Sequence, residues 1–349
     1  MDRRQLLQGL PIGLLASLAP VSLDALYART TPDAKRPLAA LLLPLSGEGA
    51  DLGRSMAHAG GLAQPADTKD TGKNALLVFD TQGTAAGAAT ATRAALKAGA
   101  PLLLGPLYAR EMAAVAEAAG DVPVLSFSND SAAARGRAYL FGITAGQAVE
   151  AVLTYARARG VRRVALIADP SGWGVQAGAA ARQLAGDIGI EVVAATQASW
   201  RSDPLPDAVL VSGGGPQLGA AAREFSAAGV QVLATLQATE LPSRGLAALD
   251  GAWLTAPDPE RFADFARSFE GKYGNTPGVI AGLAYDAVNI ARALRRAGHV
   301  DRDGLLAPTG FSGVTGTVRF ARDGSAAREL AVMVVEGGSL RVVERGQAG

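Results

Sequence analysis

The sequence predicts an α/β protein built on parallel β-sheets. Between residues 38 and 128 an apolar run occurs four times, and each run ends in a turn of Gly, Pro, Asp or Ser. Alanine-rich helical stretches join several of these runs, and a second βα series begins after Gly160. The runs are apolar throughout rather than alternating, which is typical of parallel strands that helices cover on both faces.

The first block contains four predicted strands, at residues 38–47, 75–81, 101–107 and 122–128. In a parallel sheet of this kind, ligands bind in the crevice beyond the carboxyl ends of the strands. We therefore expect functional residues at Ser46, within 106–110 and within 126–130.

The second block continues the pattern, with predicted strands at 161–169, 190–196, 207–211 and 230–237 and helices at 174–188 and up to 228. Glycine ends most of the predicted helices, because it readily takes the left-handed conformation after a last helical turn. The expected helix stops are Gly99, Gly120, Gly160, Gly229, Gly274 and Gly298.

The C-terminal part of the chain changes character. Two long helices are predicted at 259–273 and 279–297, and short strands follow them. The dipeptides Asp323-Gly324 and Gly337-Gly338 are turns of hairpin type, so these strands are expected to be joined as hairpins.

The link between the predicted strands 190–196 and 207–211 is short. Residues 197–206 include Pro204 and Pro206, whereas a parallel crossover usually needs a dozen or more residues and a helix. We therefore expect one face of the second lobe to lack a covering helix there. This would expose the sheet or create a docking surface.

Composition limits the class of protein. The chain has 349 residues and 49% apolar content, enough for about two domains with good-sized cores. Its net charge is +1, and its 33 basic and 32 acidic residues are scattered, so no electrostatic footprint for nucleic acid is present. The absence of cysteine excludes disulfides, thiol chemistry and a lipid-modified N-terminal cysteine.

Residues 1–28 are interpreted as an export signal, because positive charge precedes an apolar stretch at 6–23. Arg3 and Arg4 resemble a twin-arginine pair, although Asp2 replaces the usual Ser or Thr. The alternative is an ordinary N-terminal helix or an uncleaved anchor. No other segment has the ~20 continuous apolar residues that span a bilayer, so we expect a periplasmic protein whose mature form has no membrane span.

Catalytic and metal-binding patterns are largely missing. His58 and His299 have no Cys, carboxylate pair or second His at ligand spacing, so metal sites and Ser-His-Asp triads have little support. Gly213, Gly215 and Gly219 loosely imitate a dinucleotide-binding turn, but the spacing differs and the next strand lacks the acidic residue that binds ribose. We expect no enzymatic activity, no metal and no cofactor.

Five motifs together resemble one family. They read LLLPLSGEGADLGRSM, FDTQGTAAGAATATRAAL, LLLGPLYAREMAAVAEAAGDVPVLSFSND, GLAYDAVNIARAL and FSGVTGTVRFARDG. In this order and spacing they resemble the type I periplasmic solute-binding fold, in its Leu/Ile/Val-binding branch, over nearly everything after Pro37. Within that branch the sequences of these motifs are most similar to those of bacterial penicillin-binding protein activators. Those proteins are relatives of a lipoprotein that stimulates peptidoglycan synthases.

The resemblance implies two Rossmann-like lobes with parallel sheets, joined by three interlobe crossings. The first lobe is expected at residues 36–143 and 257–308, and the second at 144–256 and 309–344. Family members close like a hinge on a small ligand in the cleft between the lobes.

The resemblance also implies a set of ligand-binding residues. In amino-acid binders the turn after the third strand supplies hydroxyl groups to the ligand carboxylate, whereas here it reads Tyr108, Ala109, Arg110. The Arg110 guanidinium is a candidate partner for a carboxylate. The complete set of candidates is Ser46, Tyr108, Arg110, Ser128, Asn129, Trp173, Gln237 and Ile280.

Several of these residues also have a purely structural interpretation. Arg110 is equally well read as a solvated first-turn residue, and Tyr108 and Trp173 as packing residues. Asn129 is of a type that often caps the following segment. Asp286 lies within a predicted helix, where core packing and capping are favoured over ligand contact.

The expected ligand is an acid or a cell-wall fragment rather than leucine. Amino-acid binders present an acidic residue from the second lobe to the ligand amine, but here the strand ending at Leu236 leads into Gln237. Any ligand is expected to contact Arg110, Asn129 and Trp173.

Two functions remain open from the sequence. The first is a regulator of peptidoglycan synthesis that binds a penicillin-binding protein. The alternative is the substrate-binding component of an ABC transporter for amino acids or other small polar solutes, with an ABC permease as its partner.

Overall fold

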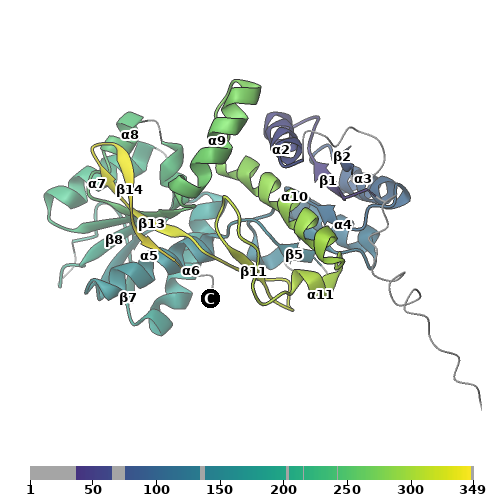
Figure 1. Ribbon diagram of the computed structural model, residues 1–349. Coiled ribbons are helices and arrows are strands. Elements are labelled where there is room, and N and C mark those ends of the chain that lie inside the picture. The colour runs from purple at the N-terminus through teal and green to yellow at the C-terminus, as the bar shows by residue number, and fades with distance from the viewer. Residues whose placement is uncertain are drawn as a thin grey trace, which may run out of the picture.

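The computed structural model describes residues 37–64, 75–133, 138–201, 204–214, 216–241 and 243–346. The interpreted export signal, with Arg3 and Arg4, lies outside the described residues. The described chain forms two α/β lobes, each with its own sheet, which lie side by side in Figure 1. The predicted fold class is thereby confirmed.

The sheet of the first lobe has five parallel strands in the order β2-β1-β3-β4-β5. They are β1 (Ala39–Leu43), β2 (Leu76–Asp80), β3 (Leu103–Leu104), β4 (Val124–Ser126) and β5 (Ala138–Leu140). All four apolar runs of the first block form strands. The strand β5 was not predicted, because three residues are too few to show a periodic pattern.

Helices cover both faces of this sheet, as strands without alternation require. The helices are α2 (Ala50–Leu62), α3 (Ala85–Lys97), α4 (Ala109–Ala119) and α10 (Val279–Ala297). On one face Ala40 and Leu42 pack with residues of α3 and α4. On the other face Leu41 and Leu43 pack with residues of α2 and α10, so a helix from late in the chain completes the first lobe.

The sheet of the second lobe has seven strands in the order β14-β13-β10-β9-β8-β6-β7. They are β6 (Arg163–Ile167), β7 (Glu191–Ala195), β8 (Ala208–Val211), β9 (Gln231–Ala234), β10 (Trp253–Ala256), β13 (Ala331–Glu336) and β14 (Ser339–Arg345). The pairs from β7 to β10 are parallel, whereas β10, β13 and β14 pair in antiparallel fashion.

Helices also cover this second sheet on both faces. They are α5 (Ala145–Ala158), α6 (Gly172–Ile188), α7 (Pro216–Ala227) and α8 (Ser243–Ala247). Val164 and Leu166 pack with α5 and α6 on one face, and Val209 packs with α7 on the other. One face of each sheet thus has its own core, whereas a single hydrophobic cluster joins the other faces across the lobe boundary.

The chain crosses between the lobes three times. It passes from β5 to α5 at residues 141–144 and from β10 to α9 (Pro259–Tyr273) at 257–258. After α10 it runs through α11 (Arg302–Leu305), β11 (Val318–Phe320) and β12 (Ala326–Arg328) before it returns to β13. Figure 1 shows this return as the yellow segment beside β5 and α11.

The predicted helix ends and hairpin turns are confirmed. All six expected helix stops have positive φ, including Gly274 at 77° and Gly298 at 75°, where α9 and α10 end. The strands β11 and β12 form an antiparallel hairpin, and β13 and β14 form another. Gly324, Gly337 and Gly338 take the left-handed backbone conformation in their turns.

The short link at 197–206 corrects one expectation. The strand β8 behind it is fully buried, because α7 and the side chain of Trp200 take the place of the missing crossover helix. The Trp200 ring lies edge-on to Phe225 with 4.9 Å between centroids, and its Nε1 donates to Glu224 Oε1 at 3.0 Å. On this side of the sheet, the edge strand β7 is exposed at Glu191 and Ala194.

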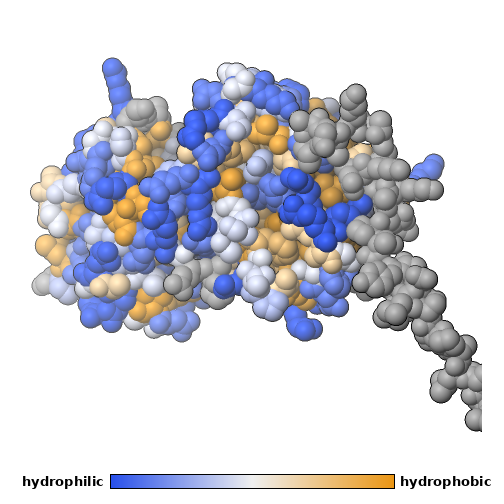
Figure 2. All heavy atoms as spheres, in the orientation of Figure 1, coloured by the Kyte–Doolittle hydropathy of each residue, from blue (hydrophilic) through white to orange (hydrophobic). Residues whose placement is uncertain are grey.

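The outer surface is mixed in character. Figure 2 shows hydrophilic and hydrophobic residues interspersed over both lobes. Val78, Val175 and Leu205 are the large hydrophobic residues that are clearly exposed in the described part of the chain. Within the same residues, no helix is long and apolar enough to cross a membrane.

Candidate functional site

A cavity of about 660 Å³ lies between the two lobes. It is lined from the first lobe by residues that follow β4 and precede α4, and from the second lobe by residues that follow β6 and β9. The lining residues are Leu52, Leu107, Tyr108, Phe127, Asn129, Ile143, Trp173, Leu236, Gln237, Thr239, Phe262, Pro277, Gly278, Val279, Ile280 and Leu283. The cavity therefore has the position expected for a ligand site, beyond the carboxyl ends of parallel strands.

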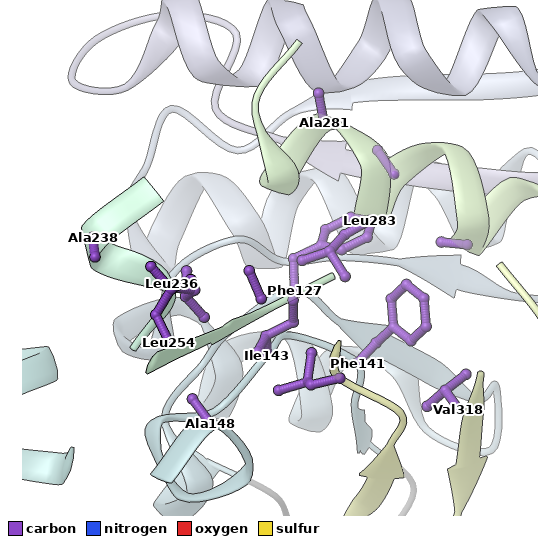
Figure 3. Packing of buried hydrophobic residues seen from close by; sticks show 14 of the residues in the cluster. Phe127, Phe141, Ile143, Ala148, Leu236, Ala238, Leu254, Ala281, Leu283 and Val318 are labelled. Carbon is purple, nitrogen blue, oxygen red and sulfur yellow. The ribbon is translucent and has the colours of Figure 1, made fainter. Parts of the chain in front are cut away.

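The walls of the cavity are largely apolar. Phe127, Ile143, Leu236 and Leu283 are buried and belong to one hydrophobic cluster. Figure 3 shows Phe127, Ile143 and Leu283 converging from three separate elements, with Leu236 of the second lobe close to them. The apolar cluster runs across the lobe boundary, so contact between the lobes keeps this surface away from water.

Two amide side chains supply polar groups to the cavity from opposite lobes. Asn129 follows β4, and Gln237 lies in the short 3-10 helix η2 (Leu236–Glu240) that follows β9. Neither amide has a hydrogen-bond partner within the part of the chain that the structure describes, and both line the cavity. Each amide offers one acceptor and two donor positions to a ligand.

Two other polar side chains at the cavity are already engaged. The Trp173 Nε1 donates to Thr235 Oγ1 at 3.0 Å, which sets the orientation of the indole at the first turn of α6. The Thr239 hydroxyl donates to the carbonyl of Leu236 at 2.7 Å. The Trp173 ring remains one of the groups that line the cavity, so it offers an apolar surface to a ligand.

Tyr108 stands immediately before α4. Its hydroxyl occupies the space beside Gly49, where a Cβ would lie only 1.9 Å from that oxygen. Burial raises the pKa of the Tyr108 phenol. The Tyr108 backbone N–H donates to Glu111 Oε2 at 3.0 Å, so a side chain of the protein itself satisfies this donor at the helix start.

The structure brings together five of the predicted site residues. Tyr108, Asn129, Trp173, Gln237 and Ile280 all line the cavity.

The other three predicted residues are not among its lining. The Ser46 hydroxyl donates to Asp80 Oδ2 at 2.6 Å, outside the cavity. The Ser128 side chain is buried, and its Oγ accepts the backbone N–H of Asp130 at 3.1 Å.

Arg110 also points away from the cavity. Its Nε donates to the carbonyl of Gly83 at 2.9 Å, and its guanidinium carbon lies 4.2 Å from the centroid of the Tyr108 ring. Its Nη2 is 3.8 Å from Glu48 Oε2. In this arrangement Arg110 is not placed to pair with a carboxylate in the cavity.

Several lining residues were missed from the sequence, although Phe127 lies within the expected range 126–130. Leu236 stands at a strand end, so the rule that directed attention to that range could have found it. Phe262 lies on α9 and Leu283 on α10. The sequence pattern of a helix shows that an apolar residue faces inward, but it does not show whether that residue lines a cavity or packs in a core.

A metal site finds no support in the described residues. No group of three or more His, Cys, Asp or Glu side chains among them is arranged to hold a metal ion. His58 stacks on Tyr273 with 4.2 Å between ring centroids, and His299 lies 3.8 Å from Asp301.

A cavity between two α/β lobes joined by three crossings defines the class of bilobed solute-binding proteins. The sequence matches the family model described as "Periplasmic binding protein" over residues 39–339, and the chain belongs to that family. Membership implies a periplasmic location. No protein of curated function matches the sequence significantly.

Solved structures of low sequence identity share the fold. A putative branched-chain amino acid ABC transporter protein from Rhodospirillum rubrum has a TM-score of 0.74 and 22% identity, over 88% of this chain and 99% of that one. A Rhodopseudomonas palustris ABC transporter solute-binding protein in complex with 3,4-dihydroxybenzoic acid has a TM-score of 0.64 and 18% identity, over 90% and 97%. LivJ from Streptococcus pneumoniae in complex with isoleucine has a TM-score of 0.59 and 19% identity, over 89% and 99%.

These comparisons confirm the resemblance to the type I periplasmic binding fold. They lend no support to the finer resemblance to penicillin-binding protein activators or to a role in peptidoglycan synthesis. The solved structures are instead described as an ABC transporter protein, a solute-binding protein of an ABC transporter and a transporter substrate-binding protein.

Proposed function

We propose that this protein is the solute-binding component of an ABC importer. The observation that carries the proposal is the cavity of about 660 Å³, to which both lobes contribute wall residues and uncharged polar side chains. Family membership and the printed descriptions of the structural relatives support it. This was the alternative hypothesis from the sequence, and it replaces the regulator of peptidoglycan synthesis as our preferred function.

The proposed mechanism is closure of the lobes on a solute. We propose residues 36–143 with 257–308 as one lobe and 144–256 with 309–344 as the other. A ligand that contacts Asn129 of the first lobe and Gln237 of the second bridges both, so it binds the closed arrangement more tightly than an open one. Such a difference in affinity shifts the population toward the closed state, which a permease then recognises.

The first experiment identifies what the protein carries. The exported protein is purified without added solutes, denatured, and its released small molecules are identified by mass spectrometry. We expect one solute in stoichiometric amount. A solute bound only to the native state at a hundred times its Kd adds about 2.7 kcal/mol to the free energy of unfolding, so returning it to the refolded protein should raise Tm clearly.

A pair of variants tests whether the solute lies in this cavity. Trp173→Ala removes a ring that lines the cavity, whereas Val175→Ala changes an exposed residue on the same helix. We expect Trp173→Ala to abolish most of the Tm shift and Val175→Ala to preserve it. Equal shifts in both variants would place the solute elsewhere and contradict the proposal.

A further inference from the structure

Resting on the solute-binding function proposed above, we infer that the ligand is an uncharged and mainly apolar molecule. It carries a ring or branched hydrocarbon and a neutral carbonyl, amide or hydroxyl group. Neither a zwitterionic amino acid nor a free carboxylate fits the cavity. The inference depends on the charge of the walls, on the donors at the start of α4 and on the two amides.

The walls of the cavity contain no charge. Among the residues that the structure describes, every side chain that lines the cavity is apolar, aromatic, a hydroxyl or an amide. A carboxylate or an ammonium group that leaves water for such surroundings loses its hydration without gaining an opposite charge. An uncharged solute does not incur that loss, so the lining discriminates against ions.

At the start of α4, two groups that could hold a carboxylate are already used inside the protein. A helix N-terminus is a favourable place for an anion, but at the start of α4 the Tyr108 N–H donates to the Glu111 carboxylate. Glu111 is fully buried, so this donor at the helix start is satisfied within the protein. The Arg110 guanidinium, on the first turn of the same helix, donates to the carbonyl of Gly83 instead.

The polar groups left for a ligand are neutral and lie on opposite lobes. The amides of Asn129 and Gln237 both line the cavity and make no hydrogen bond within the described residues. A side-chain amide both donates and accepts, so it pairs well with a ligand carbonyl, amide or hydroxyl. The rings of Phe127, Trp173 and Phe262 surround these two groups with apolar surface.

A matched pair of probes tests this inference. Cinnamamide and cinnamate have nearly the same shape and differ in charge, and leucine serves as the zwitterion. Each is titrated calorimetrically into the mature protein after unfolding and refolding have removed any bound solute. We expect cinnamamide to bind at least tenfold more tightly than cinnamate or leucine, a difference of about 1.4 kcal/mol.

A variant that introduces a charge gives a result that misfolding could not produce, because it should reverse the preference between the two probes. Gln237→Lys places an ammonium in the cavity and should reverse the preference, so that cinnamate binds more tightly than cinnamamide. Gln197→Lys makes the same change at an exposed position outside the cavity and should leave the preference unchanged. Circular dichroism and Tm confirm that both variants are folded.

The remaining outcomes separate the ligand class from the proposed function. Tighter binding of cinnamate or leucine to the unmodified protein would overturn the ligand class and leave solute binding in place. If no probe binds, the molecule released from the native protein decides: a neutral apolar solute supports the inference, and an amino acid or an acid overturns it. Absence of both probe binding and a released solute would overturn the proposed function as well.

Discussion

The hydroxyl of Thr315 donates to the buried carboxylate of Asp286 at 2.5 Å, and this contact joins helix α10 to the third interlobe crossing. The backbone N–H groups of Val314 and Thr315 donate to the same carboxylate, each at 2.8 Å. Arg328 Nη1 donates to Thr315 Oγ1 at 2.9 Å, and its Nη2 donates to the carbonyl of Phe141 at 2.6 Å. One buried network therefore joins the first crossing to the third.

The Asp286 network predicts a large loss of stability for Asp286→Ala. The variant leaves the buried Arg328 without its nearby negative charge and leaves two backbone donors without an acceptor. We expect the free energy of unfolding to fall by about 3–5 kcal/mol, measured by urea denaturation. Asp264→Ala, which removes an exposed carboxylate on α9, should change stability by less than about 1 kcal/mol. Similar losses in both variants would contradict the network's role.

Asp258 predicts a specific dependence on pH. Burial alone would raise the pKa of its carboxyl, but hydrogen bonds from Arg345 and from the backbone N–H of Glu260 bring that pKa below its ordinary value. A carboxyl with a lowered folded-state pKa stabilises the protein above its ordinary pKa, and this stabilisation is lost as the pH falls through that range. We expect Asp258→Asn to be less stable at pH 7 by about 1 kcal/mol, with the difference from wild type shrinking toward pH 3.

The measurement is urea denaturation at several pH values. Asp51→Asn controls for the loss of one negative charge, because the Asp51 side chain is almost completely exposed. A difference between wild type and Asp258→Asn that stays constant from pH 7 to pH 3 would count against the ion pair with Arg345.

The close packing of Gly282 against Phe262 predicts that a substitution outside the cavity lowers ligand affinity. A Cβ at this position would lie 2.6 Å from Cε2 of Phe262, which lines the cavity. Gly282→Ala should displace that ring, weaken cinnamamide binding several-fold and cost about 1–3 kcal/mol of stability. Gly271→Ala, on α9 with open space around it, should leave binding unchanged and stabilise the protein by up to ~1 kcal/mol. Calorimetry and thermal unfolding distinguish the two variants.

The packing of Trp200 predicts that the link at 197–206, which contains no helix, contributes to the stability of the fold and not to ligand binding. Trp200→Ala removes a fully buried ring that packs on Phe225 and should lower the free energy of unfolding by about 3–5 kcal/mol. Because Trp200 does not line the cavity, the Kd for cinnamamide should remain unchanged under conditions where the variant is folded. Leu205→Ala, at an exposed position of the same link, should have little effect on either quantity.

The Arg3-Arg4 pair predicts the export route. If it is part of a twin-arginine signal, replacing both residues with lysine should block export, and the unprocessed protein should accumulate in the cytoplasm. Fractionation and immunoblotting measure the distribution. Delivery of the double variant to the periplasm at the normal rate would show that another route is used.

Much of the fold was predictable because it depends on local composition. Apolar runs such as 75–81 form buried strands, and the glycines at the expected helix stops take the left-handed conformation they were chosen for. Strand ends directed attention to Asn129, because the carboxyl ends of parallel strands meet at one edge of a sheet. Gln237 was a candidate only through the family resemblance.

The link at 197–206 shows where such reasoning fails. Its length correctly indicated that a helix is missing, but a count of residues cannot show what fills the space. Trp200 and α7 cover the strand β8 through contacts with residues more than twenty positions away in the chain.

The sequence by itself determined the class of the protein, because the order of apolar runs, glycine stops and hairpin turns dictates two α/β lobes. The tertiary structure alone decided which side chains meet in the cleft. The sequence allowed Arg110 to face a ligand. In the folded protein its guanidinium instead contacts the Gly83 carbonyl and the Tyr108 ring. Phe262 and Leu283 became cavity walls because α9 and α10 return to the first lobe after the chain has built most of the second. Side-chain direction and long-range packing depend on the three-dimensional fold, and these set the chemistry of the site.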